Sequence, residues 1–402
     1  MKKRLTRGEK WLFASPLLFL VVAGLLWQRQ KNAPETLEIP YVVRLEFSPD
    51  SKRLVAFNND VPRRQYAGQV YDLEAHVKVC DLEMPIISTR GGDYLWSPSW
   101  SPDGTRITAR SQYYNAPDIL SRVSVWDAAT GLQKVEQHFP ATESSLMSGP
   151  ISFAPDGKTL VGEGMPSARY DASTGQRLNR PDKTFKDSYV VLKEKLGLFS
   201  WSSPDQKLLK IVDVKTGKII WKIQSHSLRR YGWTGDRLSV ADDKQLLIWD
   251  GKSRKLLSSP PIPVGARVDA YTLHPKLSTL TYSQYTSEAV PDTEDTFNEK
   301  HELIAWDYLD KRELWRTRTT DSLESLGWSP DGKWLAALQN NYKGVNLLLV
   351  FDQNGQLRYQ NGPVSYLARW SPDSKKLATE SVRMDNRDTF VFSRVQIHRF
   401  ED

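Results

Sequence analysis

The sequence predicts an all-β chain, because short strand patterns and tight turns recur along most of its 402 residues. Two half-units alternate. The first places an aromatic residue before a Ser-Pro-Asp turn and a strand, as in FSPDSKRLVAF from Phe47, WSPDGTRITA from Trp100 and WSPDGKWLAAL from Trp328. The second is a β-branched run ending in aromatic-Asp, as in VSVWDAATG from Val123 and LIAWDYLDK from Leu303. Alternation with a period of two is typical of half-buried strands, and no helical period follows residue 35.

The acidic residue that closes the second half-unit measures the repeat length. It falls at Asp81, Asp127, Asp171, Asp213, Asp250, Asp307, Asp352 and, in degenerate form, Glu401. These spacings of 37 to 57 residues scatter around the roughly 40 to 45 residues of a four-stranded propeller blade. We therefore expect a single β-propeller of eight four-stranded blades, or of seven if the fourth or fifth module does not form a full sheet.

The turns have residues suited to their backbone geometry. Pro sets φ at the first central position, Asp can bond its own backbone, and Gly accepts positive φ. We expect Pro102-Asp103-Gly104 to join two inner strands and Thr130-Gly131 to close an outer hairpin. The turn aspartates are thus predicted to be structural. The 14 Trp residues recur before the turns, as at Trp100, or before the Asp, as at Trp126, and are expected to fill the space between blades.

The repeat resembles known families. The WSPDG turn is similar to the TolB-like propeller repeat, and VxVWDxxTG is similar to the WD repeat. The resemblance covers most of residues 36–402 and implies a WD40-like β-propeller. Two departures are visible: His274-Pro275-Lys276 replaces the turn in the sixth module, and the Gly-His pair of strict WD repeats is absent, so their buried His–Asp network is not expected. The resemblance implies a fold and leaves the function open.

The N-terminus is predicted to be a membrane element. Residues 1–10 form a basic cytoplasmic segment, 11–27 a transmembrane signal-anchor helix, 28–35 a tether and 36–402 the propeller domain. The 17 uncharged residues from Trp11 to Trp27 span about 26 Å as a helix, enough for a bilayer core. The excess of basic residues before them predicts a propeller on the periplasmic or extracellular side. Cleavage near Val21-Val22-Ala23, which would give a secreted protein, is the alternative.

Charge excludes one class of partner. The net charge of +7 lies almost wholly in residues 1–34, which hold seven basic residues against one acidic residue. The nearly neutral remainder lacks the basic stripe of a nucleic-acid-binding surface, so no nucleic-acid partner is expected. Cys80 is the only cysteine and permits no internal disulfide or cysteine-rich metal cluster. We expect a monomeric propeller.

The longest loops are expected at one end of the ring. In a blade with strands a to d from the axis outward, the b–c loops and the connections between blades share one rim. The predicted b–c loops are residues 58–75, 111–121, 284–301, 339–345 and 383–389. Tyr and Arg, which dominate recognition surfaces, are frequent in these segments. The predicted partner-binding residues are Arg63, Arg64, Tyr66, Tyr71, Tyr113, Tyr114, Arg229, Arg230, Tyr231, Tyr342, Arg383 and Arg387.

Signals for catalysis are weak. The sequence has no GxSxG, HExxH, CxxC or phosphate-binding glycine loop, and its histidines do not pair at ligand spacing. The acidic loop 284–301 matches no calcium motif, so neither a metal nor a cofactor is expected. The sequence favours a non-catalytic scaffold that binds a protein or peptide. The alternative is an exported enzyme or small-ligand binder, such as a quinoprotein-like dehydrogenase, which KTGKIIWKI from Lys215 resembles, or a sugar-active lyase.

Overall fold

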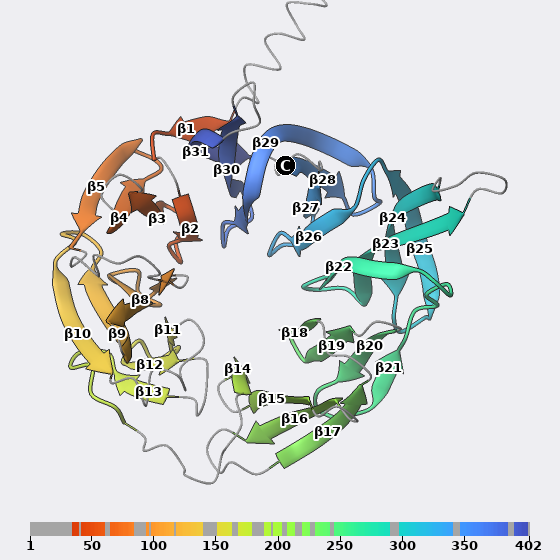
Figure 1. Cartoon of the computed structure of the whole chain (residues 1–402), viewed down its shortest axis with the longest axis horizontal. Helices are drawn as coiled ribbons and strands as arrows, with labels where there is room; N and C mark the ends of the chain where they lie inside the picture. Colours follow the sequence, from red (N-terminus) through yellow and green to blue (C-terminus); the bar gives the residue numbers. More distant parts are fainter. Residues whose placement is uncertain are drawn as a thin grey trace, which may run out of the picture.

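The computed structural model shows small antiparallel sheets arranged in a ring around one axis (Figure 1). It describes residues 34–39, 42–60, 65–83, 94–95, 98–115, 118–139, 151–162, 168–178, 189–193, 196–202, 207–213, 219–225, 230–241, 245–289, 297–340, 346–384 and 390–400. These residues contain strands and turns and no α-helix, so none of them forms a helix suited to crossing a bilayer. The predicted segments 1–10 and 11–27 and most of the tether 28–35 lie outside the described residues.

The first half of the ring contains four sheets, each built outward from an inner strand near the axis. The first is β2(Val42–Phe47), β3(Arg53–Asp60), β4(Gln65–Asp72) and β5(Val77–Leu82). The second has two short inner strands, β6(Tyr94–Leu95) and β7(Ser99–Trp100), followed by β8(Arg106–Asn115), β9(Asp118–Asp127) and β10(Gln133–Phe139). The third has three described strands, β11(Ile151–Phe153), β12(Thr159–Gly162) and β13(Ala168–Asp171). The fourth is β14(Tyr189–Lys193), β15(Leu196–Ser202), β16(Lys207–Asp213) and β17(Ile219–Ser225).

The second half of the ring continues the pattern. The next sheets are β18(Arg230–Thr234), β19(Arg237–Ala241), β20(Leu246–Asp250), β21(Leu256–Ser258), and then β22(Arg267–Leu273), β23(Thr279–Ala289), β24(Phe297–Asp307), β25(Arg312–Thr319). The last is a seven-stranded sheet of β26(Leu323–Trp328), β27(Trp334–Asn340), β28(Asn346–Asp352), β29(Leu357–Trp370), β30(Lys376–Met384), β31(Phe390–Arg399) and β1(Glu35–Leu37). The fourth and fifth modules thus both form full four-stranded sheets, which removes the condition on which seven blades were expected.

Strand β29 belongs to two neighbouring units of that seven-stranded sheet. Its first part pairs with β28, for example Tyr359 with Val350. Its last part pairs with β30, as Trp370 does with Leu377. The register shifts between Val364 and Ala368, at the bend between the two parts. One strand therefore serves as the outer strand of one unit and the inner strand of the next.

The two ends of the described chain close the ring. Strand β1 pairs antiparallel with β31, with Glu35 opposite Ile397 and Leu37 opposite Val395. The first and last strands lie side by side at the top of Figure 1. Residues near the start of the described chain thus supply the outer strand beside β31. Because β31 would otherwise present an open edge, the pairing satisfies backbone groups that could template association with other chains.

The Ser-Pro-Asp turns have the predicted chemistry. Ser101 Oγ donates to Asp103 Oδ1 at 2.5 Å, and the same carboxylate oxygen accepts the Thr105 backbone N–H at 3.0 Å. Gly104 has a φ of 69°, which glycine adopts at little cost. Hydrogen bonds from several donors hold the pKa of Asp103 down to about 2. The turn carboxylates are thus bound within their own turns, as expected for structural residues.

The first module differs from the sequence prediction. Asp72, and not Asp81, closes its second half-unit, since Asp72 Oδ1 accepts the backbone N–H groups of Glu74 and Ala75 at 2.8 Å each. Asp81 lies in the outer strand β5. The predicted loop 58–75 is likewise wrong, because β3 and β4 continue as a regular hairpin from Asn58 through Asp60 to Gln65 and Asp72.

The core lies between neighbouring sheets. Trp100 and Trp126 pack in one cluster with Phe57 and Val55 of the preceding sheet. Their indole N–H groups also donate hydrogen bonds to the preceding sheet. Trp100 Nε1 donates to Glu46 O at 3.1 Å, and Trp126 Nε1 donates to Glu83 O, just after β5, at 2.8 Å. The repeated tryptophans therefore join adjacent sheets, as predicted, with apolar area and with a satisfied polar group.

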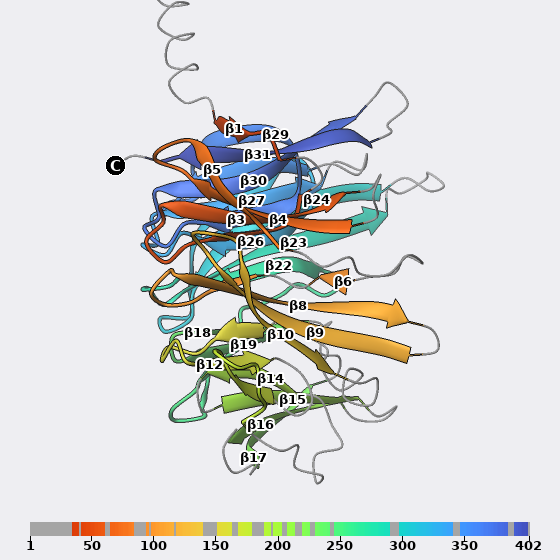
Figure 2. The ribbon, with the colours of Figure 1, turned by 90° about the vertical axis from the view of Figure 1, so that its left-hand side faces the viewer.

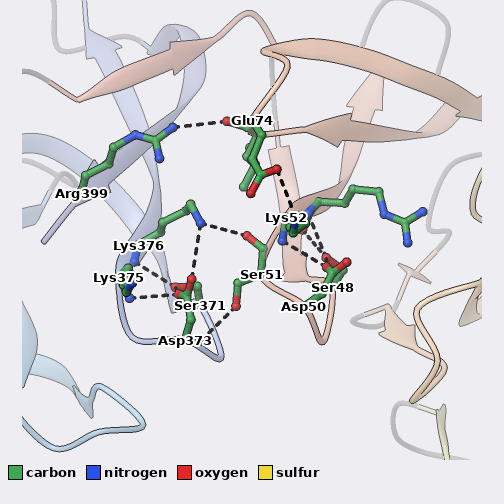
Figure 3. A network of polar contacts seen from close by, with 12 residues as sticks. Ser48, Asp50, Ser51, Lys52, Glu74, Ser371, Asp373, Lys375, Lys376 and Arg399 are labelled. Atoms are coloured by element: carbon green, nitrogen blue, oxygen red, sulfur yellow. Dashed lines mark hydrogen bonds and ion pairs between the residues drawn. The ribbon is translucent and has the colours of Figure 1, made fainter. Parts of the chain in front are cut away.

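A second kind of contact links consecutive turns. Arg53 Nη2 donates to Gly104 O at 2.6 Å while its guanidinium lies 5.2 Å from the Trp100 ring. Arg106 makes the same two contacts one module later. Its Nη2 donates to Gly157 O at 2.5 Å, and its guanidinium lies 5.1 Å from the centre of the Phe153 ring. At the ring closure, Lys376 Nζ donates to Ser51 O at 3.1 Å (Figure 3).

Candidate functional site

The two ends of the ring differ in the connections they carry. The a–b and c–d turns of a sheet lie together at one end, as the Ala128 N–H donating to Thr105 O at 2.9 Å illustrates; we call this end the turn face. The b–c hairpins reach the opposite end, which we call the b–c rim. Figure 2 shows the strand pairs β8–β9 and β23–β24 extending on the side away from the C-terminus. The rim is therefore the end of the ring with the longer projections.

The predicted binding residues divide into three groups. Residues Arg63, Arg64, Arg229, Tyr342 and Arg387 lie outside the described residues. The backbone alone is described for six others, and it lies at strand ends on the b–c rim. These are Tyr66 in β4, Tyr113 and Tyr114 in β8, Arg230 and Tyr231 in β18, and Arg383 in β30. The topology thus brings segments from four sheets to one rim.

Tyr71 is the member that the structure places elsewhere. It lies in β4 opposite Leu54, next to the turn face, and not in a rim loop. Its ring packs against the core cluster that contains Leu45 and Leu54, and its hydroxyl donates to Gln69 Oε1 at 3.0 Å. Partial burial raises the pKa of Tyr71. The assignment of Tyr71 to a loop was wrong because the strand continues further than its polar sequence indicates.

The sequence also misplaced the acidic loop. Residues 284–301 were expected to form a loop, but β23 and β24 run as a paired ladder out to Ala289 and Phe297. This long hairpin carries a row of side chains across the sheet: Arg267 pairs with Tyr285, and Tyr285 pairs with His301. All three side chains point to one face, because directly opposite residues in an antiparallel pair share a face.

This row, which we call the β22–β24 rim cluster, consists of Arg267, Tyr285, Glu299 and His301. The Arg267 guanidinium lies 5.2 Å from the centre of the Tyr285 ring, within the range of a cation–π contact. The Tyr285 and His301 rings are 5.0 Å apart. The Tyr285 hydroxyl donates to Glu299 Oε1 at 3.0 Å, and His301 Nε2 is 3.7 Å from Glu299 Oε2. The cluster is thus a connected polar and aromatic surface.

One buried atom in the cluster has no hydrogen-bond partner in the described part of the chain. His301 is only 7% exposed, yet its Nδ1 forms no hydrogen bond with any described residue. A buried polar atom without a partner loses on the order of 1–3 kcal/mol. Such a group is therefore a candidate to contact a ligand or an ordered water. The cluster faces the next sheet, since Ser283 Oγ, two residues before Tyr285, donates to Leu323 O at 3.1 Å.

An exposed apolar side chain stands near the cluster. The connection from β21 to β22 includes a turn closed by the Ala266 N–H donating to Pro263 O at 3.0 Å, with Gly265 at a φ of 83°. This is the geometry of a turn with glycine at its third position. Val264, at the second position, is fully exposed. The turn precedes Arg267 directly, so an exposed apolar side chain lies three residues before the first member of the rim cluster along the chain.

Sequence reasoning missed Val264, Arg267, Tyr285 and His301. The signal was the register of the β23–β24 hairpin, which decides that Tyr285 and His301 are opposite each other. That register depends on the length of a hairpin whose distal residues are polar, so apolar periodicity does not define it. As for metals, the described residues include no group of three or more His, Cys, Asp or Glu side chains arranged to hold an ion.

Comparisons with known proteins agree on the fold. No protein-family model matches the sequence, and no curated protein matches it. The solved structure of BamB from Moraxella catarrhalis is 11% identical, with a TM-score of 0.52, and the match covers 91% of this chain and 98% of that chain. A structure described as the eukaryotic initiation factor is also 11% identical, with a TM-score of 0.53, covering 92% of this chain and 91% of that chain.

The ring of antiparallel sheets and these likenesses define the class of protein. The chain has the WD40-like β-propeller fold, which confirms what the repeat motifs implied. At 11% identity, the likenesses carry the fold alone. Activity and partners must therefore be argued from this chain's own residues.

Proposed function

We propose that this chain is a membrane-tethered, extracytoplasmic β-propeller that binds a protein or peptide partner through its b–c rim without catalysing a reaction. The observation that carries this proposal is the β22–β24 rim cluster. It combines Arg and Tyr, the residue types that dominate recognition hot spots, with His301 Nδ1, which has no hydrogen-bond partner among the residues that the structure describes. A rigid ring that holds such side chains at one end is suited to recognition.

We also infer that the ring has eight blades. The bend in β29 divides the seven-stranded sheet into β26–β29 and β29–β31 with β1. With the six other sheets, this division supports eight units. The third unit has three described strands, and an isolated bridge between Tyr170 and Arg177 lies where an outer strand would begin. Averaged electron-microscopy projections along the ring axis would count the blades directly.

The membrane tether belongs to the same proposal. It rests on the uncharged stretch from Trp11 to Trp27 and the basic residues before it. The full-length chain should stay in the membrane pellet after alkaline carbonate extraction, and its intact mass should include residue 1. Release into the soluble fraction with a mature N-terminus after Ala23 would instead support the secreted alternative.

Partner binding is tested by cross-linking and affinity purification of the full-length chain from membranes. The variant combines Arg267→Ala and Tyr285→Ala, which remove the cation–π pair from the rim. Loss of these two recognition side chains should lower recovery of the cross-linked partner by about tenfold or more. Leu309→Ala is the control, because Leu309 is an exposed residue of the same sheet, in the turn after β24 on the turn face.

Comparison of the two variants shows whether the partner binds at the b–c rim or at another surface of the ring. Recovery with Leu309→Ala should stay within about twofold of the native chain, since a surface substitution away from the binding site changes stability little. Equal recovery of every partner by the native chain and by the rim variant would contradict the proposal. Circular dichroism of both variants establishes that the ring is intact.

A further inference from the structure

A pocket lies on the turn face, between the Ser-Pro-Asp turns that precede β27 and β30. Its volume is about 370 Å³, within the range of small-molecule sites. Lys333 from the turn before β27 and Trp334 at the start of β27 line one side. Lys375 from the turn before β30 and Lys376 at the start of β30 line another, together with Arg399 at the end of β31 and Phe400 after it. This pocket is at the opposite end of the ring from the rim cluster.

One wall of the pocket is aromatic and firmly held. The Phe400 ring is 5.7 Å from the Trp334 ring and 5.1 Å from the Trp370 ring. The Tyr359 ring approaches Phe400 edge-on at 5.8 Å. The Phe400 backbone N–H donates to Lys375 O at 2.8 Å. The wall therefore offers a fixed apolar surface to a bound group, without loss of side-chain freedom on binding.

The rest of the lining is predominantly basic. Four cationic side chains stand against two carboxylates, those of Asp331 and Asp373. Both carboxylates are committed to their own turns: Asp331 Oδ1 accepts Ser329 Oγ at 2.6 Å, and Asp373 Oδ1 accepts Ser371 Oγ at 2.5 Å. Hydrogen bonds and nearby lysine charge lower the pKa of Asp373 despite its partial burial. Arg399 is also paired with Glu35, so among the described residues the four cationic side chains exceed the three nearby carboxylates by one charge.

Two lysines provide donors to the pocket. Lys376 is only 8% exposed. Its ammonium donates to Ser51 O at 3.1 Å and lies 3.5 Å from Asp373 Oδ2 (Figure 3). An ammonium has three N–H donors, so one remains without an acceptor among the described residues. The exposed Lys375 ammonium likewise contacts no described acceptor. Both ammonium groups therefore have N–H donors that can reach an anion in the pocket.

We propose that this pocket binds a carboxylate carried next to a large apolar group, as at the free C-terminal end of a polypeptide whose last residue is aromatic. The lysine ammonium groups would receive the carboxylate, and the Trp334–Phe400 wall would contact the apolar group. Capture of a terminal carboxylate is an established mode of peptide recognition. The site goes beyond the rim function, because it uses other residues at the other end of the ring.

The probe is the peptide acetyl-Ala-Ala-Phe with a free carboxylate, titrated into the purified full-length chain in detergent by calorimetry. Its C-terminal amide is the matched control ligand. Loss of the charge-assisted hydrogen bonds should weaken binding of the amide by about tenfold or more. Equal binding of acid and amide, or no heat with the acid up to about 10 mM, a limit set by the affinity scale of weak ligands, would overturn the proposal.

A third ligand, 3-phenylpropionate, distinguishes the two sources of this chemistry. Tighter binding of the peptide acid indicates a polypeptide end, because the peptide backbone adds contacts. Equal affinities indicate that any aryl carboxylate is accepted. Both results support the carboxylate site, and the comparison shows whether its ligand is a polypeptide end or any aryl carboxylate.

The variant for this test combines Lys333→Gln and Lys375→Gln, and the control is Lys158→Gln. Lys158 occupies the same position of the turn in the third sheet, where it is away from the pocket. The double variant should weaken binding of the acid by about tenfold or more, whereas Lys158→Gln should change it less than about twofold. An unchanged affinity of the double variant would contradict the site. Its recovery of rim partners should match the native chain, so failure at the pocket is distinct from failure at the rim.

Discussion

At the scale of single residues, His398 is a titratable group within the core. Its side chain is 2% exposed. One ring nitrogen lies 2.9 Å from the Tyr359 hydroxyl oxygen, and the other lies 2.8 Å from Thr379 Oγ1. Burial lowers the pKa of His398 to about 4. The imidazole is therefore neutral at neutral pH, where it joins three strands of the seven-stranded sheet.

The first prediction is a loss of stability in mild acid. The unfolded chain takes up a proton at His398 near pH 6.5, whereas the folded chain does so only near pH 4. The free energy of unfolding should therefore decrease as pH falls through this interval, by about 2 kcal/mol at pH 5. His398→Gln cannot titrate, so its free energy of unfolding should change less between pH 7 and pH 5 in urea titrations.

The comparison has an internal control. Between pH 7 and pH 8, His398 is predominantly neutral in both folded and unfolded chains, so the native chain and His398→Gln should respond nearly alike. A pH dependence between pH 7 and pH 5 that is identical in the two proteins would rule out His398 as the cause.

At the scale of elements, consecutive turns are joined by an arginine of repeated design. Arg53 and Arg106 follow the Ser-Pro-Asp turns in the same position, and each reaches the carbonyl and the anchor ring of the next turn. The third sheet has Thr159 at this position, which is too short for such a link. The strength of the connection between neighbouring sheets therefore differs around the ring.

The second prediction concerns this link. Arg106→Ala removes a 2.5 Å hydrogen bond to Gly157 O and the contact with Phe153. Together these should lower the free energy of unfolding by about 1–3 kcal/mol. Arg312→Ala is a suitable control, because Arg312 is highly exposed and forms a long ion pair, at 3.6 Å, with Asp310. Equal effects of the two substitutions in urea titrations would show that the link contributes nothing specific.

The sequence was sufficient to predict the structural elements whose residues recur in each module. The turn of Pro102-Asp103-Gly104 and the core position of Trp126 were predicted from local backbone chemistry and apolar spacing. The long b–c hairpins were not, because Thr286 to Ala289 and Phe297 to Lys300 are mostly polar. Residues that project beyond the ring have no buried face, so the period-two signal of a strand is lost.

The candidate site was predicted only in outline for the same reason. The rim was identified by topology, and Tyr113 and Arg383 do lie at its strand ends. The partnership of Tyr285 with His301 required a register that the sequence does not specify. Tyr71 was misplaced for the same reason as loop 284–301, because a polar run that resembled a loop is a paired strand.

At the scale of the whole molecule, the strand formed by residues 35–37 contributes to closing the ring. Leu37 is 6% exposed and packs in a cluster with Val395 and Ile397. Arg399 Nη2 donates to Glu35 Oε2 at 2.8 Å and to Leu73 O at 3.3 Å. These contacts join the last strand both to β1 and to the first sheet.

The third prediction follows from this closure. Deleting residues 35–37 removes β1 and exposes the edge of β31. The variant should unfold at a temperature several degrees lower, since each 1 kcal/mol lowers the midpoint by about 2–4 °C in a large domain. It should also associate, because an unpaired edge accepts other strands. Calorimetry and light scattering measure the two effects. A monomeric variant with the native midpoint would show that closure depends on other contacts.

The pairing of β1 with β31 has a consequence for synthesis. A ribosome releases β1 among the first residues of the described chain and β31 among the last, and Glu35 and Arg399, which bond to each other, are 364 positions apart. The earliest strand must therefore wait, unpaired, until translation is nearly finished. A chain truncated before β31 would leave β1 without its pairing partner. The ring can therefore close through β1 only after β31 has been synthesised.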